Sequence, residues 1–420
     1  MNMILELLNW IAALGPMVMM PIIMFIIGVC FRLPLGKLIR ACITTGVGFA
    51  GVTITINFFI SSVGPAIGQM VAAWGLRTDI MDVGWPARAA ATWSFPMAAI
   101  VVLCIIAVNI IMLSLKRTRC VMVDFWSYNH FIFSAALIWY ATNSTVLAIA
   151  GAIVTAIVTF KLADWTAPLA ESFFGLPGVS FPTANSVNWA PIAYVMEKIY
   201  DKIPGFKNIK ADPQNIQEHF GVLGEPVIMG LFFGLIIGVM GHQDVGSTLT
   251  VGMSTAAAMV LTPKMMQILM EGLMPFADGV KDMLNKKYSG GNFTIGIDAA
   301  LTVANPAAIS VGIMMVPTTL ILATVLPGNR LLPLPDIAYQ AMWLAAWPAA
   351  FSKGNILRAY ITTIFITVIM LLIATDMADI HTKLALAGGF TLPKGISVIS
   401  TEDAGTHLLS WIIWKICSII

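Results

Sequence analysis

A broken, polar stretch inside an otherwise apolar chain is the feature that most constrains how this sequence folds. The stretch runs from Pro168 to Pro191 and reads PLAESFFGLPGVSFPTANSVNWAP, with four prolines and two glycines. These residues exclude one continuous spanning helix. Irregular polar backbone is tolerated at membrane depth only where protein buries it or where it lines a water-filled cavity. The stretch therefore predicts a substrate site.

A second broken stretch, from Gly290 to Pro306, reads GGNFTIGIDAALTVANP. It holds the lone acid Asp298 in apolar surroundings and ends in Asn305 and Pro306. Two interrupted segments in corresponding places of two halves are typical of the central binding site of a transporter. The sequence thus predicts two re-entrant hairpins that contribute to one site.

The composition is that of a membrane protein. Of the 420 residues, 58% are hydrophobic and 10% are charged, whereas about a quarter of the residues of a soluble protein are charged. We expect an all-α polytopic membrane protein with about 10–11 transmembrane helices, because about 20 helical residues cross the hydrocarbon core. The predicted spans are Leu7–Phe31, Ala41–Ile60, Thr92–Leu115, Phe125–Thr142, Thr145–Phe160, Pro226–Met240, Ser247–Met270, Ala307–Leu326, Ile337–Phe351, Ile356–Thr375 and Leu408–Ile420.

A charged segment, residues 197–224, divides the chain into two apolar halves, 1–196 and 225–420. Each half holds several spans and one broken stretch, which predicts an inverted-topology repeat. No cleavable signal precedes the first span, so we expect a bacterial inner-membrane protein in contact with lipid. Basic residues favour cytoplasmic loops and follow the first and third spans, which places the N-terminus in the periplasm. These residues are Arg32, Lys37, Arg40, Lys116, Arg117 and Arg119.

Asp298 is the strongest candidate for chemistry. A carboxylate inside a membrane is costly, so such residues usually face a cavity and act there. It could accept hydrogen bonds from hydroxyl groups and take the proton from an attacking hydroxyl in phosphoryl transfer. A structural salt bridge is the alternative interpretation.

His130 and its neighbour Asn129 open an apolar span and are candidates for binding substrate. An imidazole nitrogen can donate to or accept from a polyol hydroxyl. Neighbouring aromatic side chains, Trp126 and Tyr128, could contact the apolar edge of a sugar. The alternative is that His130 is an interfacial or capping residue.

The polar residues Asn185, Ser186 and Asn188 of the first broken stretch could bind a polar ligand, or they could bond the broken backbone itself. Asn305 of the second stretch is a further candidate for binding. Glu225 precedes Pro226 at the head of a span. It is a candidate catalytic acid, although capping of the helix dipole would also explain it.

Several motifs are missing from the sequence. It contains neither a GxxxxGK[ST] phosphate loop nor HExxH, and its histidines and cysteines lack metal-site spacing. We therefore expect no nucleotide cofactor and no metal, and energy for transport must come from a gradient or from a partner protein.

Taken together, a set of short motifs resembles the galactitol family of IIC components of the bacterial phosphotransferase system, which is distantly similar to the ascorbate IIC transporter. The resemblance extends from about Leu14 to Leu384. Its motifs are Gly46-Val47-Gly48-Phe49, Asp82-Val83-Gly84-Trp85-Pro86, Asn109, Val123-Asp124, His130, Ala163-Asp164-Trp165, Gly224-Glu225-Pro226-Val227, Gly296-Ile297-Asp298 and Leu326-Pro327-Gly328-Asn329.

The resemblance implies a homodimer with a scaffold domain and a mobile core domain, and elevator-like transport of a sugar. It also implies two partners, a IIB protein that donates phosphate from a phosphocysteine and a IIA protein that charges IIB. His130, Asp298 and Glu225 match family positions. The chain departs from the family pattern at Thr183 and at Ala304-Asn305, so the resemblance implies a polyol or a related sugar.

The sequence is thus interpreted as a phosphotransferase permease for a galactitol-like polyol or sugar. The alternative is a proton- or ion-coupled secondary transporter that uses Asp298 and His130 as proton carriers. Neighbouring genes for IIA and IIB proteins would favour the first interpretation.

Overall fold

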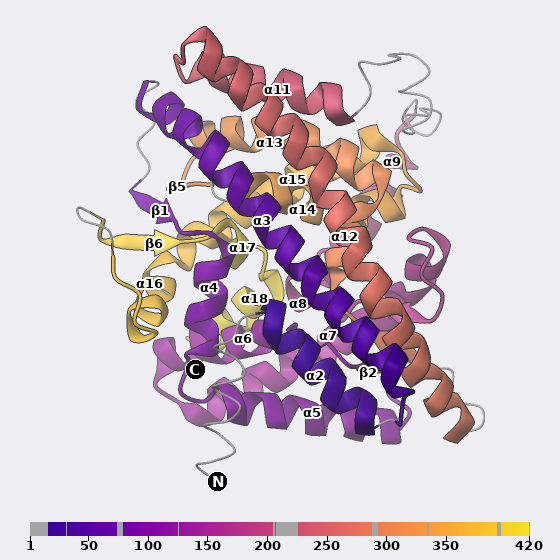
Figure 1. The fold of residues 1–420 in the computed structure, drawn as a ribbon. Helices are drawn as coiled ribbons and strands as arrows, with labels where there is room; N and C mark the ends of the chain where they lie inside the picture. Colours follow the sequence, from indigo (N-terminus) through magenta and orange to yellow (C-terminus); the bar gives the residue numbers. More distant parts are fainter. Residues whose placement is uncertain are drawn as a thin grey trace.

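The architecture described below is that of a computed structural model of the 420-residue chain. It describes residues 16–30, 32–73, 79–124, 126–204, 206, 226–287, 293–333, 336–392 and 396–419. Helices dominate this part of the chain (Figure 1). Glu225 and most of the charged segment 197–224 lie outside the described residues.

The helices of the first half alternate with three very short strands. The helices are α2 (Pro16–Cys30), α3 (Leu35–Ala73), α4 (Gly84–Trp93), α5 (Ala98–Ser114), α6 (Tyr128–Thr142), α7 (Thr145–Ser172), α8 (Ala184–Val187) and α9 (Ala190–Tyr200). The strands are β1 (Ile80–Asp82), β2 (Cys120–Met122) and β3 (Val179–Ser180).

The second half follows a similar order. Its helices are α11 (Pro226–Met240), α12 (Val245–Lys287), the 3-10 helix η3 (Ala299–Ala304), α13 (Pro306–Val325), α14 (Ile337–Phe351), α15 (Ile356–Asp376), α16 (Ala378–Ala387), α17 (Glu402–Gly405) and α18 (Leu408–Cys417). Its strands are β4 (Thr294–Gly296), β5 (Leu331–Leu332) and β6 (Val398–Ser400).

The six strands form two parallel, three-stranded sheets that join the halves. In one sheet β1 lies between β5 and β6, with Ile80 opposite Leu331 and Val398. In the other, β4 lies between β2 and β3, with Ile295 opposite Val121 and Val179. The first strand of each half is therefore the central strand between the second and third strands of the other half. The sequence prediction contained no strands, because segments of two or three residues are too short to show a strand period.

Two long helices, α3 and α12, run side by side across the molecule (Figure 1). Small residues allow their backbones to approach closely. A Cβ atom on Gly48 of α3 would lie 2.5 Å from the Cα atom of Leu269 in α12, and a Cβ atom on Gly272 would lie 2.5 Å from the backbone nitrogen of Thr45. Both helices are longer than the spans predicted from the sequence. In particular, α3 continues as far as Ala73, beyond the predicted span Ala41–Ile60.

Three described helices, α7, α13 and α15, are long and apolar enough to cross a membrane. A fourth span is possible if residues Ala87–Trp93 and Ala98–Ser114 cross together, although an 86° bend separates them. That bend divides the predicted span Thr92–Leu115. The other predicted spans of the described region also fall on helices, of which Gly230–Met240 and Leu408–Cys417 are apolar but shorter than a full crossing. The prediction of a helical membrane protein is therefore confirmed at the level of its apolar helices.

The first broken stretch does not form one helix. Its first residues continue α7 as far as Ser172, and the chain then forms a turn, β3 and the one-turn helix α8. Residues 179–190 are all buried. Protein therefore surrounds this irregular backbone, as the membrane-depth argument requires.

Candidate functional site

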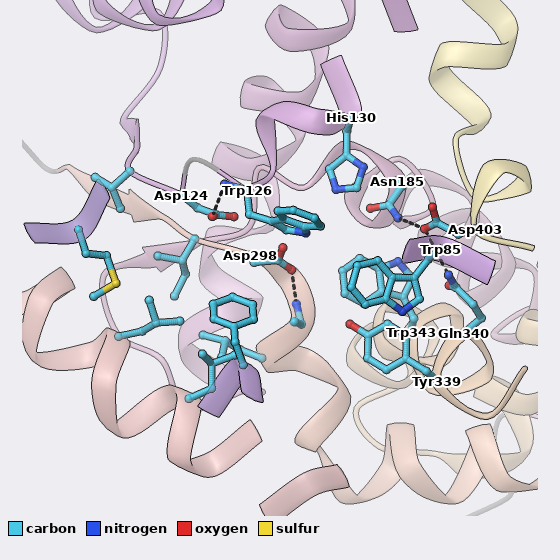
Figure 2. A pocket seen from close by; sticks show the side chains of 18 of the residues that line it. Trp85, Asp124, Trp126, His130, Asn185, Asp298, Tyr339, Gln340, Trp343 and Asp403 are labelled. Atoms are coloured by element: carbon cyan, nitrogen blue, oxygen red, sulfur yellow. Dashed lines mark hydrogen bonds between the residues drawn. The ribbon is translucent and has the colours of Figure 1, made fainter. Parts of the chain in front are cut away.

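A cavity lies where the ends of the two sheets meet α6, α14 and the α3–α12 pair (Figure 2). Polar groups from both halves line it together with aromatic side chains. The residues that line the cavity are Met24, Phe49, Trp85, Arg88, Val123, Asp124, Trp126, His130, Asn185, Leu269, Leu273, Phe276, Ile297, Asp298, Ala300, Leu301, Tyr339, Gln340, Trp343 and Asp403.

Two carboxylates at the carboxyl ends of neighbouring strands, Asp298 after β4 and Asp124 after β2, share one hydroxyl group. Ser127 Oγ lies 2.5 Å from Asp124 Oδ2 and 3.4 Å from Asp298 Oδ2. Asp298 Oδ1 accepts a 2.7 Å hydrogen bond from the amide of Ala300 and so caps η3. A hydroxyl has only one proton, and the shorter bond takes it to Asp124. Asp298 Oδ2 is therefore left as an acceptor toward the cavity.

Asp298 is not part of an ion pair within the described residues. The alternative interpretation of Asp298, a structural salt bridge, is therefore not observed among the described residues. The neighbouring Thr183 hydroxyl accepts a 2.8 Å hydrogen bond from the amide of Ala299, which ties α8 to the start of η3. Residues of the two broken stretches therefore lie together at the cavity.

A buried ion pair forms another wall of the cavity. Arg88 of α4 pairs with Asp403 of α17, and both side chains are about 5% exposed or less. The other oxygen of Asp403 accepts hydrogen bonds from Asn185 Nδ2 at 3.0 Å and from Gln340 Nε2 at 3.2 Å. A buried carboxylate can remain charged when it is paired with a cation and hydrogen-bonded. Arg88 and the two amides supply these contacts to Asp403.

Two buried histidines lie in line beside this network. His130 Nδ1 is 2.9 Å from His407 Nε2, and His407 Nδ1 is 2.9 Å from the backbone oxygen of Asp403. His130 points into the cavity (Figure 2). His407 lies behind it against the ring of Phe133, at 4.7 Å between centroids.

Aromatic rings supply the apolar surface of the cavity. Trp85 and Trp126 meet edge to face with centroids 6.0 Å apart. Tyr339 and Trp343 lie 5.7 Å apart on one face of α14. An apolar cavity with a few converging polar groups is the usual form of a small-molecule site.

Four predicted site residues lie away from this cavity. Asn129 donates to the backbone oxygen of Trp126 at 2.7 Å. Ser186 Oγ accepts from the indole of Trp347 at 3.0 Å, while Asn188 bonds the backbone of Thr406 and Leu409 at 3.3 and 3.1 Å. These three side chains therefore bond backbone groups or the indole of Trp347.

Asn305 caps α13 by accepting from the amide of Ala307 at 2.9 Å, and it lines a separate hollow with Glu271 and Gln267. Glu225 lies outside the described residues. Of the predicted site residues, the structure brings Asp298, His130 and Asn185 together at the cavity. No group of three or more His, Cys, Asp or Glu side chains in the described ranges could hold a metal ion.

Sequence reasoning missed several polar residues of the site. Arg88 is not among the predicted site residues, and Asp124 appears in the prediction only as part of a motif. Asp403, His407 and Gln340 were not considered at all. The run Thr401-Glu402-Asp403 carries the signal of a helix start, since Thr401 caps α17 through the amide of Ala404, but it gives no hint of contact with α4 or α8.

Comparison with known proteins decides the family. The family model described as the PTS system sugar-specific permease component matches residues 10–395. The chain belongs to this permease family. It is 35% identical over 413 residues to the PTS system galactitol-specific EIIC component of Escherichia coli strain K12, which covers 98% of this chain and 91% of that protein. It is also 33% identical over 411 residues to a putative permease IIC component of the same strain, at 98% and 94% coverage.

The resemblance read from the sequence motifs is thereby confirmed. As a IIC component, this permease is the membrane part of a sugar phosphotransferase system and works with IIA and IIB proteins. A sugar or sugar alcohol is its substrate class.

Proposed function

We propose that this permease carries a galactitol-like polyol through the cavity around Asp298, His130 and Asn185. The observation that supports this most is the set of acceptor and donor groups that converge there from both halves of the chain. Three carboxylates, those of Asp124, Asp298 and Asp403, face one guanidinium in the cavity. Such a site disfavours an anionic ligand and suits a neutral, hydroxyl-rich one. The galactitol-specific relative supports the same class.

In this proposal Asp298 is the catalytic residue. Its Oδ2 atom is left as an acceptor and would bind the hydroxyl that becomes phosphorylated, taking up the proton as phosphate arrives from IIB. His130 and Asn185 would hold other hydroxyl groups of the polyol. Glu225 remains a proposed second acid, and Asn129, Ser186, Asn188 and Asn305 are proposed to support the backbone around the site.

We further propose that the two halves, near residues 1–196 and 225–420, form an inverted repeat. The strand pairing supports this, because β1 and β4 each lie between two strands of the other half. So does the order in which a two- or three-residue strand is followed by a one-turn helix, β3–α8 in the first half and β6–α17 in the second. In this order, Pro168 to Pro191 corresponds to the region of β6 and α17, whereas Gly290 to Pro306 corresponds to the region of β1 and α4.

A repeat of this kind fits elevator-like movement of a core domain. In this arrangement each broken stretch would be a re-entrant hairpin that enters and leaves the membrane by the same face. We also propose a homodimer in lipid in the bacterial inner membrane with its N-terminus in the periplasm, in accord with the basic residues that follow the first and third predicted spans.

A transport assay in cells tests the substrate. A bacterial strain that lacks its own galactitol IIC component but keeps IIA and IIB should regain uptake of radiolabelled galactitol when it produces this chain. A panel of other hexitols and hexoses provides the comparison. If another member of the panel is taken up and galactitol is not, the galactitol assignment is wrong.

A further inference from the structure

We infer that Asp403 and His407, in and just after α17, orient three hydrogen-bond acceptors toward the cavity. The site therefore selects ligands whose hydroxyl groups can donate hydrogen bonds to these acceptors. The three acceptors are Asn185 Oδ1, Gln340 Oε1 and His130 Nε2. This inference rests on the proposed function of the cavity as the polyol site. Asp403 and His407 act here as positioning residues, because each holds a group that would contact the ligand: Asp403 holds the two amides and His407 holds the imidazole of His130.

The carboxylate of Asp403 fixes the orientation of two amides. Only the NH2 group of an amide can donate to a carboxylate, whereas a flipped amide would place two acceptor oxygens against each other. Asn185 Nδ2 and Gln340 Nε2 both donate to Asp403 Oδ1. Their oxygens, Asn185 Oδ1 and Gln340 Oε1, are buried and have no partner among the described residues. Figure 2 shows the Asn185 amide joined to Asp403 through its nitrogen at the edge of the cavity.

The backbone of Asp403 fixes the tautomers of two histidines in the same way. A carbonyl oxygen can only accept, so His407 Nδ1 carries the proton of the 2.9 Å bond to Asp403 O. Both rings are at most 4% exposed, and the charged Arg88 is a near neighbour, so the neutral ring is favoured for each.

A neutral His407 then has a bare Nε2 that accepts from His130 Nδ1 at 2.9 Å. It follows that His130 carries its single proton on Nδ1. Its Nε2 is left as an acceptor on the cavity side, where His130 makes no further hydrogen bond to a described residue.

The donors that line the cavity include the indoles of Trp85 and Trp343, whose Nε1 atoms are without a partner among the described residues. A hydroxyl group can donate to an acceptor and accept from an indole at once. A carboxylate group on the ligand would be repelled by the acceptors of Asp298 and of the amide oxygens. A carbonyl group on the ligand cannot donate, so it would leave the buried acceptors unpaired, which is costly. A ligand with many free hydroxyls therefore fits this pattern best.

The tautomer of His130 can be measured directly. The chain has five histidines, so 15N-histidine NMR of the full-length protein in nanodiscs is feasible, with His130→Gln assigning the signal. We expect a protonated Nδ1 and a bare Nε2 for His130. His407→Phe should change this spectrum, His407→Gln should retain it because its amide oxygen can still accept, and the exposed His242→Asn should leave it unchanged. A proton on His130 Nε2 in the wild type would overturn the inference, whether or not any polyol binds.

Calorimetric binding of galactitol and its monodeoxyfluoro analogues tests the selection. Fluorine cannot donate a hydrogen bond, so at least one analogue should bind the wild type about tenfold more weakly than galactitol. The ratio of the two affinities should shrink in His407→Phe and in Asp403→Asn. It should recover in His407→Gln. Equal affinity for every analogue would contradict selection by donors. If galactitol itself fails to bind while His130 shows the expected tautomer, the substrate proposal fails and the orientation of the acceptors stands.

Discussion

Asn185 and Asp403 each hold the second position of a four-residue helix, α8 and α17, and Asn185 Nδ2 donates a 3.0 Å hydrogen bond to Asp403 Oδ1. This contact joins residues that are 218 positions apart in the chain. Each helix follows a short strand, β3 or β6. The halves therefore meet at the cavity through two one-turn helices, one of which supplies an amide and the other a carboxylate.

Asp298→Asn should reduce phosphorylation-coupled uptake by about 100-fold or more, the usual effect of losing a general base. An asparagine oxygen can still accept from the amide of Ala300, so we expect η3 and the thermal unfolding midpoint to be little changed. Uptake of radiolabelled polyol and thermal unfolding measure the two effects. Asp244→Asn, at an exposed carboxylate before α12, is the control. Normal uptake by Asp298→Asn would remove this carboxylate from the mechanism.

Arg88→Met should destabilise the protein by about 3–5 kcal/mol, because it leaves a buried carboxylate without its cation. The double variant Arg88→Met with Asp403→Leu should be more stable than Arg88→Met alone. Thermal unfolding of both variants in nanodiscs checks this. Additive losses in the double variant would mean that the two charges do not act as a pair.

Gly48→Ala should loosen the pair formed by α3 and α12, since the added methyl group would lie 2.5 Å from the Cα atom of Leu269. Overpacking of this kind typically costs about 1–3 kcal/mol. Phe49 and Leu269 line the cavity, so uptake should also fall. Gly36→Ala, in the first turn of α3 with open space around it, is the matched control and should change neither property.

Asp79 and Arg330 form an exposed ion pair at the edge of the β1–β5 sheet, and the arginine lowers the pKa of Asp79 from 3.8. A carboxyl with a lowered folded-state pKa contributes stability above 3.8 that is lost as the pH falls through the lower value. Exposed pairs contribute only about 0–1 kcal/mol. Arg330→Gln should thus shift the unfolding midpoint slightly at pH 7 and by less as the pH falls below 3.8. A larger shift at pH 2 would contradict this sign.

The sequence predicted those features that depend on local composition. The apolar helices, the buried broken stretch before Asn185 and the unusual acid Asp298 all follow from the cost of placing polar groups in an apolar setting. Other features depend on contacts between distant residues. Arg88 and Asp403 are 315 positions apart, and strands of two or three residues have no period of their own. Their pairing could be seen only once the chain was folded.

The chemical fate of the transported polyol tests the central claim most directly. Purified permease in sealed vesicles should be given radiolabelled galactitol outside and phosphorylated IIB protein within the lumen, with the chain oriented so that its IIB-binding face is inside. Galactitol phosphate should accumulate only when phosphorylated IIB is present and should not respond to a proton or sodium gradient. Accumulation of unmodified galactitol that follows an ion gradient without IIB would contradict the account and favour a secondary transporter.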